Sequence, residues 1–107
     1  MDESVFHETA DIILEDLVDG IEMADEEGEV EVDYIDGVVS IILPDGSEYI
    51  INKHEPSRQI WLSSPFSGSN KFSYNEDEDD WMPEEGRNFK DFISIEFSTH
   101  CNINLDY

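Results

Sequence analysis

The fold is decided by residues 29–46, EVEVDYIDGVVSIILPDG, in which apolar and acidic side chains alternate before a tight turn. The period of two over residues 30–34 predicts a strand with one buried face. The Asp-Gly pair at 36–37 is a strong hairpin signal, because both residues tolerate the positive φ angles of a two-residue turn. A second strand is therefore expected over residues 38–43, and the Pro-Asp-Gly sequence at 44–46 predicts the next turn.

The same pattern continues downstream, and an amphipathic helix flanks the strands on each side. Further strands are predicted at residues 48–52, 59–64, 71–74 and 81–82. Before the strands, apolar residues recur at steps of three and four from Phe6 to Ile21, with Ser4 as a candidate N-cap. After them, Asn88 is a candidate N-cap for a helix that runs to about Cys101. This order predicts an α+β fold in which two terminal helices pack on one face of a five- to six-stranded antiparallel sheet. We expect one domain over residues 1–107.

The composition is strongly acidic, with 28 Asp and Glu residues against 5 Lys and Arg and a formal net charge of −23. Such a charge argues against binding nucleic acid, where phosphates must be neutralised, and against binding an anionic membrane surface. No stretch approaches the roughly 20 apolar residues of a membrane span. The single cysteine excludes an internal disulfide and indicates a reducing compartment.

The acidic residues concentrate in the first 52 positions, which hold 17 of the 28 and contain no Lys or Arg. On the predicted first helix, five of them fall within an arc of roughly 80°: Glu8, Asp11, Glu15, Asp19 and Glu22. Mutual repulsion should raise the pKa values of these carboxyl groups. Their combined negative field should attract a cation or a basic partner. Hard oxygen ligands suit Mg²⁺, Ca²⁺, Mn²⁺ and iron, but a convex ridge predicts weak binding with many water ligands. The alternative is an inert solvated surface, and the acidic run 76–80 is interpreted as a solvated hairpin loop.

The sequence offers little support for catalysis, and we predict no catalytic residue. Cys101 is interpreted as structural, because His100 is adjacent on the helix and points in a different direction. His7 is interpreted as an exposed helical residue. The alternative is an auxiliary metal ligand together with Glu3 or Asp11, which lie four residues before and after it.

A tryptophan lies on the predicted solvent side of the fourth strand. Ile60 and Leu62 share one face of that strand, which should meet the helices, so Trp61 should lie on the other. An exposed Trp among polar residues is typical of a binding hot spot. The alternative is a ring folded down over its neighbours, and His54 in the preceding turn is expected to be solvated. Three of the five basic residues lie in this central part of the chain: Lys53, Arg58 and Lys71.

These features together resemble the frataxin family, which includes the bacterial CyaY proteins. The strongest match is residues 52–65, NKHEPSRQIWLSSP, followed by Ser-Gly at 67–68. It is similar to the family signature Asn-Lys/Arg-x-x-Pro-x-x-Gln-Ile/Val-Trp-Leu. Residues 3–7 and the Gly-Ser pair at 46–47 add supporting matches, and the order of elements agrees over essentially the whole chain.

The resemblance implies an α-β sandwich with a role in iron–sulfur cluster assembly. Family members bind Fe²⁺ and Fe³⁺ weakly, and they dock on a cysteine desulfurase, alone or with its scaffold protein, to alter sulfur transfer. Carried over by position, the iron ligands are Asp11, Glu15, Asp19, Glu22, Asp25, Glu29, Glu31 and Asp33. The partner contact carried over in the same way is Asn52, Gln59 and Trp61.

Several alternatives accompany this interpretation. A ferroxidase at the ridge is one, and an acidic module that binds a basic protein without metal is another. We expect a monomer, with iron-dependent oligomers as the alternative. The acidic start of the chain is unlike a transit peptide and favours a bacterial cytoplasm, with a mitochondrion or a related organelle as the alternative. The segment after Phe97 is short, so we expect little cover for the groove between the helices and modest stability.

Overall fold

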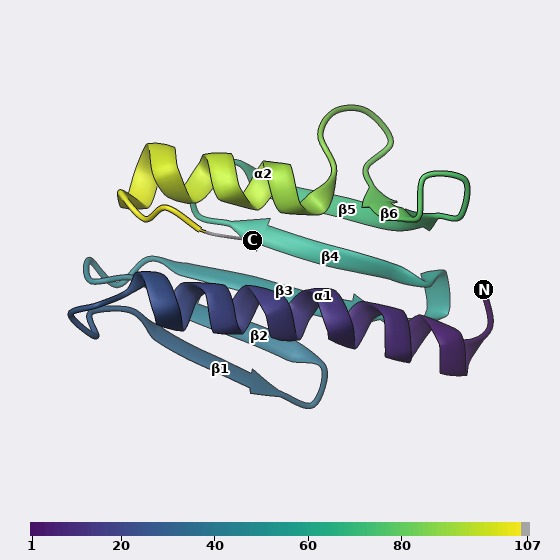
Figure 1. Ribbon diagram of the computed structural model, residues 1–107, viewed down its shortest axis with the longest axis horizontal. Coiled ribbons are helices and arrows are strands. Elements are labelled where there is room, and N and C mark those ends of the chain that lie inside the picture. The colour runs from purple at the N-terminus through teal and green to yellow at the C-terminus, as the bar shows by residue number, and fades with distance from the viewer. Residues whose placement is uncertain (106–107) are drawn as a thin grey trace.

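The computed structural model describes residues 1–105 and confirms the predicted α+β architecture (Figure 1). Helix α1 (Glu3–Ala24) precedes six strands, and helix α2 (Phe89–Glu96) follows them. The strands are β1 (Glu31–Ile35), β2 (Val38–Ile42), β3 (Glu48–His54), β4 (Gln59–Ser64), β5 (Gly68–Asn75) and β6 (Asp80–Met82). A 3₁₀ turn (Glu55–Ser57) links β3 to β4, and a π-helical turn (Phe97–Cys101) prolongs α2.

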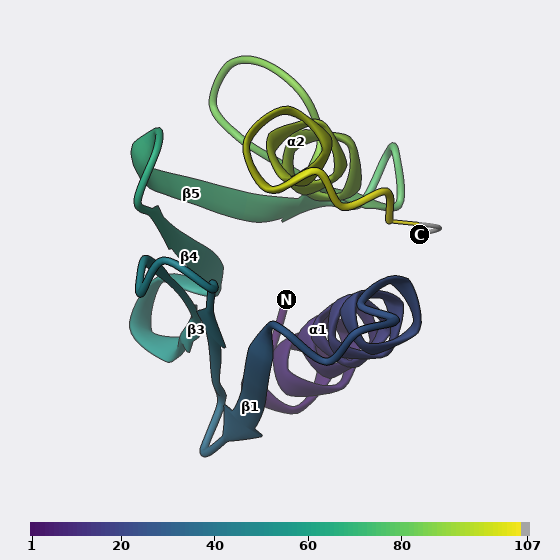
Figure 2. The same cartoon turned by 90° about the vertical axis from the view of Figure 1, so that its left-hand side faces the viewer.

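The strands form one antiparallel meander in the order β1-β2-β3-β4-β5-β6. Both helices cover the same face, with α1 beside β1 and α2 beside β5, so that the other face of the sheet carries no helix (Figure 2). In the register, Asn52 on β3 lies opposite Trp61 on β4, and Trp61 lies opposite Lys71 on β5. This register brings the residues of the resemblance together in the middle of the uncovered face.

The core lies between the helices and the sheet. Helix α1 contributes the predicted apolar stripe, with Phe6, Ala10, Leu14, Leu17 and Ile21 fully buried. The inner face of the sheet supplies alternate strand residues: Val39, Ile41, Tyr49, Ile51, Ile60, Leu62 and Phe72. Each large apolar side chain buried here contributes roughly 1.5–3 kcal/mol, which supports a stable fold despite the net charge.

The N-cap of α1 differs from the prediction, whereas the N-cap of α2 agrees with it. Asp2, not Ser4, caps α1, because the backbone of Asp2 is extended and its Oδ1 accepts a hydrogen bond of 2.8 Å from the Val5 N–H. A carboxylate also interacts favourably with the positive end of the helix dipole. The predicted cap at Asn88 is confirmed, since its Oδ1 accepts a hydrogen bond of 2.8 Å from the Asp91 N–H.

The short C-terminal segment covers more of the core than its length suggests. It turns back between the two helices (Figure 2), where Ile103 and Leu105 are half-buried against the core. Leu105 lies against Gly20 of α1, where a Cβ would be in ordinary van der Waals contact with Leu105 Cδ2, at 4.0 Å. The groove between the helices is therefore partly covered, contrary to the expectation from the short tail.

Candidate metal-binding and docking surfaces

The solvent side of α1 carries three of the predicted iron ligands as free carboxylates. Glu15, Asp19 and Glu22 are exposed, and they follow one another at helical spacing along one side of α1. This part of the predicted ridge is open to water. It can supply monodentate oxygen ligands to a hydrated cation.

Asp11 differs from those three, because a lysine neutralises it. Lys53 Nζ lies 2.7 Å from Asp11 Oδ1, and the Tyr34 hydroxyl donates a hydrogen bond of 2.5 Å to the same oxygen. Partial burial alone raises the pKa of Asp11, but these two donors outweigh it and hold that pKa below its usual range. The pair ties α1 to β1 and β3 and leaves Asp11 poorly suited to metal binding. Sequence analysis missed it because Lys53 is 42 positions away.

Asp25 also has a structural role, at the end of α1. Its two carboxylate oxygens accept hydrogen bonds from the backbone N–H groups of Glu29 (3.0 Å) and Val30 (2.9 Å), which fixes the turn into β1. The pKa of Glu29 is raised, first by a hydrogen bond with Glu27, then by repulsion from Glu27, by slight desolvation and by Asp25. Carboxylates are therefore crowded at this turn. Glu27 belongs to this group, although the positional match did not include it.

The last two predicted ligands lie on the other face of the sheet. Glu31 and Asp33 are exposed and alternate with Val32 and Tyr34, which are half-buried against the core. The expected single ridge is therefore divided. One part follows α1 and the turn after it, and a separate pair lies on β1 facing away from the helices.

The uncovered sheet face holds Trp61 in a defined position. The His54 ring stacks on Trp61 with the ring centroids 3.7 Å apart and the planes 8° from parallel. Lys71 Nζ lies 4.4 Å from the centroid of the Trp61 ring, and Trp61 Nε1 donates a hydrogen bond of 2.9 Å to Gln59 Oε1. The predicted placement of Trp61 is confirmed, and the ring is also folded over its neighbours. His54 remains partly exposed to solvent, as expected, although stacking on the indole covers one face of its ring.

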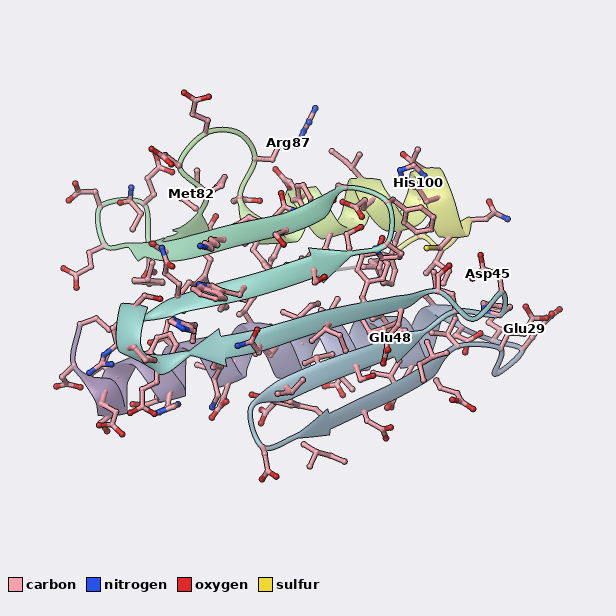
Figure 3. The ribbon with its side chains drawn as sticks, turned by 180° about the vertical axis from the view of Figure 1, so that it is seen from behind. Glu29, Asp45, Glu48, Met82, Arg87 and His100 are labelled. Carbon is pink, nitrogen blue, oxygen red and sulfur yellow. The ribbon has the colours of Figure 1, made fainter. Side chains whose placement is uncertain are left out.

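A shallow hollow and an apolar edge adjoin Trp61 on this face, which is seen from behind in Figure 3. The hollow has a volume of about 340 Å³ and is lined in part by Ile50, Asn52 and Trp61. Asn52 lies between Trp61 and Val38 on neighbouring strands, and Val38 in turn pairs with Ile35. Ile35 and Val38 are 64% and 37% exposed. The face thus combines an aromatic ring, amides and exposed aliphatic side chains, which are the components of a protein-docking surface.

Sequence analysis missed one buried charge. Glu96 on α2 is 7% exposed, and its carboxylate accepts hydrogen bonds from the hydroxyls of Tyr49 (2.8 Å), Ser64 and Ser67 (2.7 Å). Burial and this carboxylate raise the pKa of Tyr49. The signal was present in the spacing, because Glu96 follows the buried Ile93 by one helical turn. The contact joins α2 to β3 and β4 and is structural.

The remaining candidates have no developed ligand geometry. Cys101 is half-buried, and burial raises the pKa of its thiol, which agrees with a structural role. Most of the acidic loop 76–80 is exposed, and the Asn75 side chain accepts hydrogen bonds from the N–H groups of Asp77 and Glu78. Over residues 1–105, one group of three potential metal ligands converges, and it lies elsewhere: Glu3, His7 and Glu55.

The fold and these surfaces define a class of protein: a small α-β sandwich with carboxylates along its first helix and a partly exposed tryptophan on the uncovered face of its sheet. In the described part of the chain, neither helix has the length and apolar character needed to cross a membrane.

Comparison with known proteins agrees with this description. The family model described as a frataxin-like domain matches residues 1–103. The mitochondrial frataxin of Dictyostelium discoideum is 36% identical over 110 residues, which cover 98% of this chain and 56% of that protein. The iron-sulfur cluster assembly protein CyaY of Thioalkalivibrio sulfidiphilus is 33% identical over 93 residues, with 86% of each covered. The chain belongs to the frataxin-like family, and the resemblance found in residues 52–65 is confirmed.

Solved structures extend the comparison to three dimensions. A trimeric frataxin from Saccharomyces cerevisiae, solved in a ferrous complex, has a TM-score of 0.74 and 32% identity, with 85% of this chain and 83% of that chain covered. A frataxin from Psychromonas ingrahamii has a TM-score of 0.85 over 99% of this chain and 97% of that chain. Its identity is 22%, so this second comparison supports the fold alone.

Proposed function

We propose that the protein is an iron-binding regulator of iron–sulfur cluster assembly. In this proposal it binds Fe²⁺ and Fe³⁺ weakly along α1 and docks through its open sheet face on a cysteine desulfurase and its scaffold protein. Docking then alters the rate of sulfur transfer. The proposal is supported by the family, by relatives named for iron-sulfur cluster assembly, and by one relative solved in a ferrous complex.

The observation that carries the iron part is the series of free carboxylates that runs from α1 into the following turn. Glu15, Asp19, Glu22 and Glu29 are exposed, and the raised pKa of Glu29 reflects the crowding at the end of this series. A bound cation relieves that repulsion, so the folded protein should gain stability on binding. Because the exposed carboxylates of α1 lie on the convex surface of a helix, binding there should be weak and rich in water ligands.

The observation that supports docking is the arrangement around Trp61. Its ring is held between His54 and Lys71, beside Asn52 and Gln59, so little side-chain freedom remains to be lost when a partner binds. Helix α1 and the uncovered sheet face lie on opposite sides of the sheet (Figure 2). Metal binding and docking can therefore occur together.

We rank two alternatives lower. A ferroxidase needs paired metals held by converging ligands, whereas the exposed carboxylates of α1 follow a convex helix. A metal-independent acidic module would use the same carboxylates for a basic partner surface. The oligomeric state and the compartment remain predictions. We predict a monomer, with iron-dependent oligomers as the alternative. We predict a bacterial cytoplasm, with a mitochondrion, the organelle that the names of eukaryotic relatives give, or a related organelle as the alternative.

The iron part is tested by anaerobic Fe²⁺ titration followed by residue-resolved NMR. We expect shifts and broadening at Asp19, Glu22 and Glu29, with Mn²⁺ competing for the same residues. The variant Asp19→Asn with Glu22→Gln should weaken binding. The matched control is Glu31→Gln with Asp33→Asn, which removes the same charge from the opposite face of the sheet and should have the smaller effect. Equal effects of the two double variants would contradict the proposed site.

The docking part is tested by calorimetric titration against a purified desulfurase–scaffold complex. Trp61→Ala should weaken docking by about 2 kcal/mol or more, as expected for an aromatic hot spot. Phe66→Ala is the matched control, because Phe66 is an exposed aromatic residue in the β4–β5 turn and not in the row of Trp61. Iron binding should be unchanged in both variants. A folded Trp61→Ala protein with unaltered docking would show that the open sheet face is not the partner surface.

A further inference from the structure

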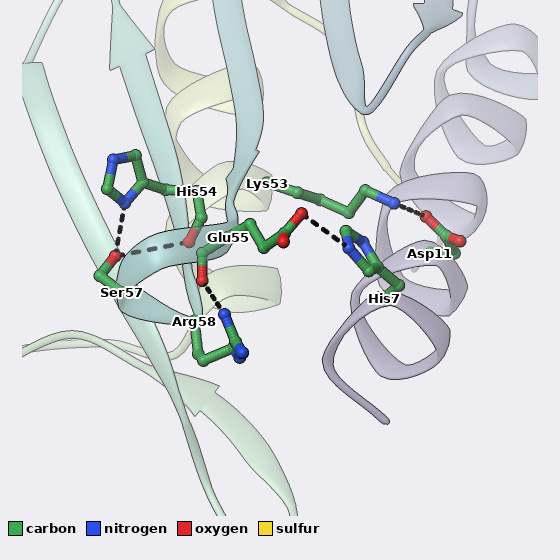
Figure 4. A network of polar contacts seen from close by, with 7 residues as sticks. All are labelled: His7, Asp11, Lys53, His54, Glu55, Ser57 and Arg58. Carbon is green, nitrogen blue, oxygen red and sulfur yellow. Dashed lines mark hydrogen bonds and ion pairs between the residues drawn. The ribbon is translucent and has the colours of Figure 1, made fainter. Parts of the chain in front are cut away.

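Three potential metal ligands from distant parts of the chain meet near the start of α1. Glu3 and His7 lie on the helix, and Glu55 is the first residue of the 3₁₀ turn after β3. Figure 4 shows Glu55 beside His7. One ligand atom from each lies within 4.8 Å of the others. His7 Nε2 and Glu55 Oε2 are 3.2 Å apart, close to the separation of two donors on one metal ion.

Both sides of this group are held in place by the fold. Glu3 and His7 are four residues apart, so they lie on one helix face, one turn above the other. Lys53 and Asp11 form their ion pair one turn further along α1, which fixes the end of β3 against the helix. The His7 ring also packs against Phe6, with centroids 5.3 Å apart. The backbone positions of the three residues are therefore set by the fold.

The local charges favour a cation at this position. Lys53 directs its ammonium group to Asp11, and the Arg58 guanidinium donates to the backbone carbonyl of Glu55, not to its carboxylate (Figure 4). The His7 and Glu55 side chains are 34% and 47% exposed, so an ion can enter from solvent with part of its water shell. Two carboxylates and one neutral imidazole compensate the charge of a divalent ion.

We propose that Glu3, His7 and Glu55 form a second metal site, which takes a divalent first-row transition-metal ion. The imidazole distinguishes it from the carboxylates of α1, because nitrogen ligands favour ions such as Co²⁺, Ni²⁺ and Zn²⁺ over Mg²⁺ and Ca²⁺. The two sites are separate, since His7 and Asp19 are 12 residues apart on one helix, or roughly 18 Å at 1.5 Å per residue. An ion here links α1 to the β3–β4 connection and so stabilises the fold.

The test uses Co²⁺ and Zn²⁺ with the intact chain. Co²⁺ should give a visible absorption band and broaden the NMR signals of His7 and of residues around Glu55, and Zn²⁺ should displace it. Binding should weaken in acid, because protons compete with a metal ion for its ligands. His7→Gln should lower Co²⁺ affinity by about tenfold or more. Loss of a residue that only hydrogen-bonds a metal ligand already costs about tenfold, and loss of a ligand should cost at least as much.

Three further variants make the result decisive. Glu55→Gln changes an exposed side chain outside the core and should also weaken Co²⁺ binding. His100→Gln removes an exposed histidine elsewhere and should leave it unchanged, as should Asp19→Asn with Glu22→Gln. The proposal is overturned if His7→Gln, shown by its melting curve to be folded, binds Co²⁺ as the parent does. It is equally overturned if Co²⁺ broadens only the signals of residues 15–29, or if His100→Gln loses as much affinity as His7→Gln.

Discussion

Replacing Glu96 by Ala should remove a large part of the stability of this protein. The hydroxyls of Tyr49 and Ser64 both donate to this carboxylate, and these residues are 0% and 7% exposed, so water cannot readily replace the lost acceptor. Each buried hydroxyl left without a partner costs about 1–3 kcal/mol. Part of this is offset because the carboxylate no longer has to be desolvated. We therefore expect a net loss of about 3 kcal/mol, set against a typical total of about 5–15 kcal/mol.

The assay is urea denaturation at neutral pH, followed by circular dichroism. Glu85→Ala is the matched control, because it makes the same change of residue at an exposed position in the loop before α2. Tyr49→Phe should cost about 1.5–3 kcal/mol, since it removes one hydrogen bond to a charged group. The double variant should cost less than the sum of the two single variants, because both remove the same contact. A Glu96→Ala protein that loses under about 1 kcal/mol, or additive effects, would refute the reasoning.

The remaining predictions concern pH and the two tryptophans. Lys53→Met should cost on the order of 1 kcal/mol at neutral pH after solvent screening of the pair. Because the folded-state pKa of Asp11 is lowered, the stability difference between the parent and Lys53→Met should be fully present above about pH 4. It should fade as the pH falls through the folded-state pKa of Asp11, which denaturation curves between pH 2 and 7 would show. The pKa of Glu29 is shifted in the opposite direction, because it is raised in the folded state. Its protonation therefore favours folding below about pH 4, and this stabilisation is lost as the pH rises through the folded-state pKa of Glu29. Glu29→Gln should accordingly raise the melting temperature at pH 7 but not at pH 3. Trp61→Ala should cost clearly less stability than the about 3–5 kcal/mol expected for Trp81→Ala in the core, and equal losses in denaturation would contradict the partly exposed placement of Trp61.

The response of stability to salt should depend on where carboxylates are crowded in the folded protein. The sequence alone predicts raised pKa values along the whole acidic helix, yet the structure shows the opposite shift at Asp11 and a raised value at Glu29. The response to salt should therefore originate mainly around the end of α1. There Glu27 and Glu29 repel each other without a basic residue among the causes of the shift.

Local patterns in the sequence were enough to determine the architecture. The period of two over residues 30–34 and the Asp-Gly turn at 36–37 predict the first hairpin, and the apolar stripe of α1 predicts which side of the helix is buried. Alternation around Ile60 and Leu62 places Trp61 on the uncovered face. These predictions succeeded because strand and helix periodicities depend on neighbours a few residues apart, which a sequence displays directly.

The tertiary structure alone decided which of the predicted site residues are available. Lys53 neutralises Asp11 across 42 positions, and Glu55 reaches His7 across 48. The same holds for Glu96, whose partner Tyr49 is 47 positions away. Such contacts depend on which strand ends lie against which helix turn, and therefore on the register and packing of the whole sheet. Composition predicted a surface that attracts cations, but long-range packing determined which carboxylates remain exposed without a basic partner.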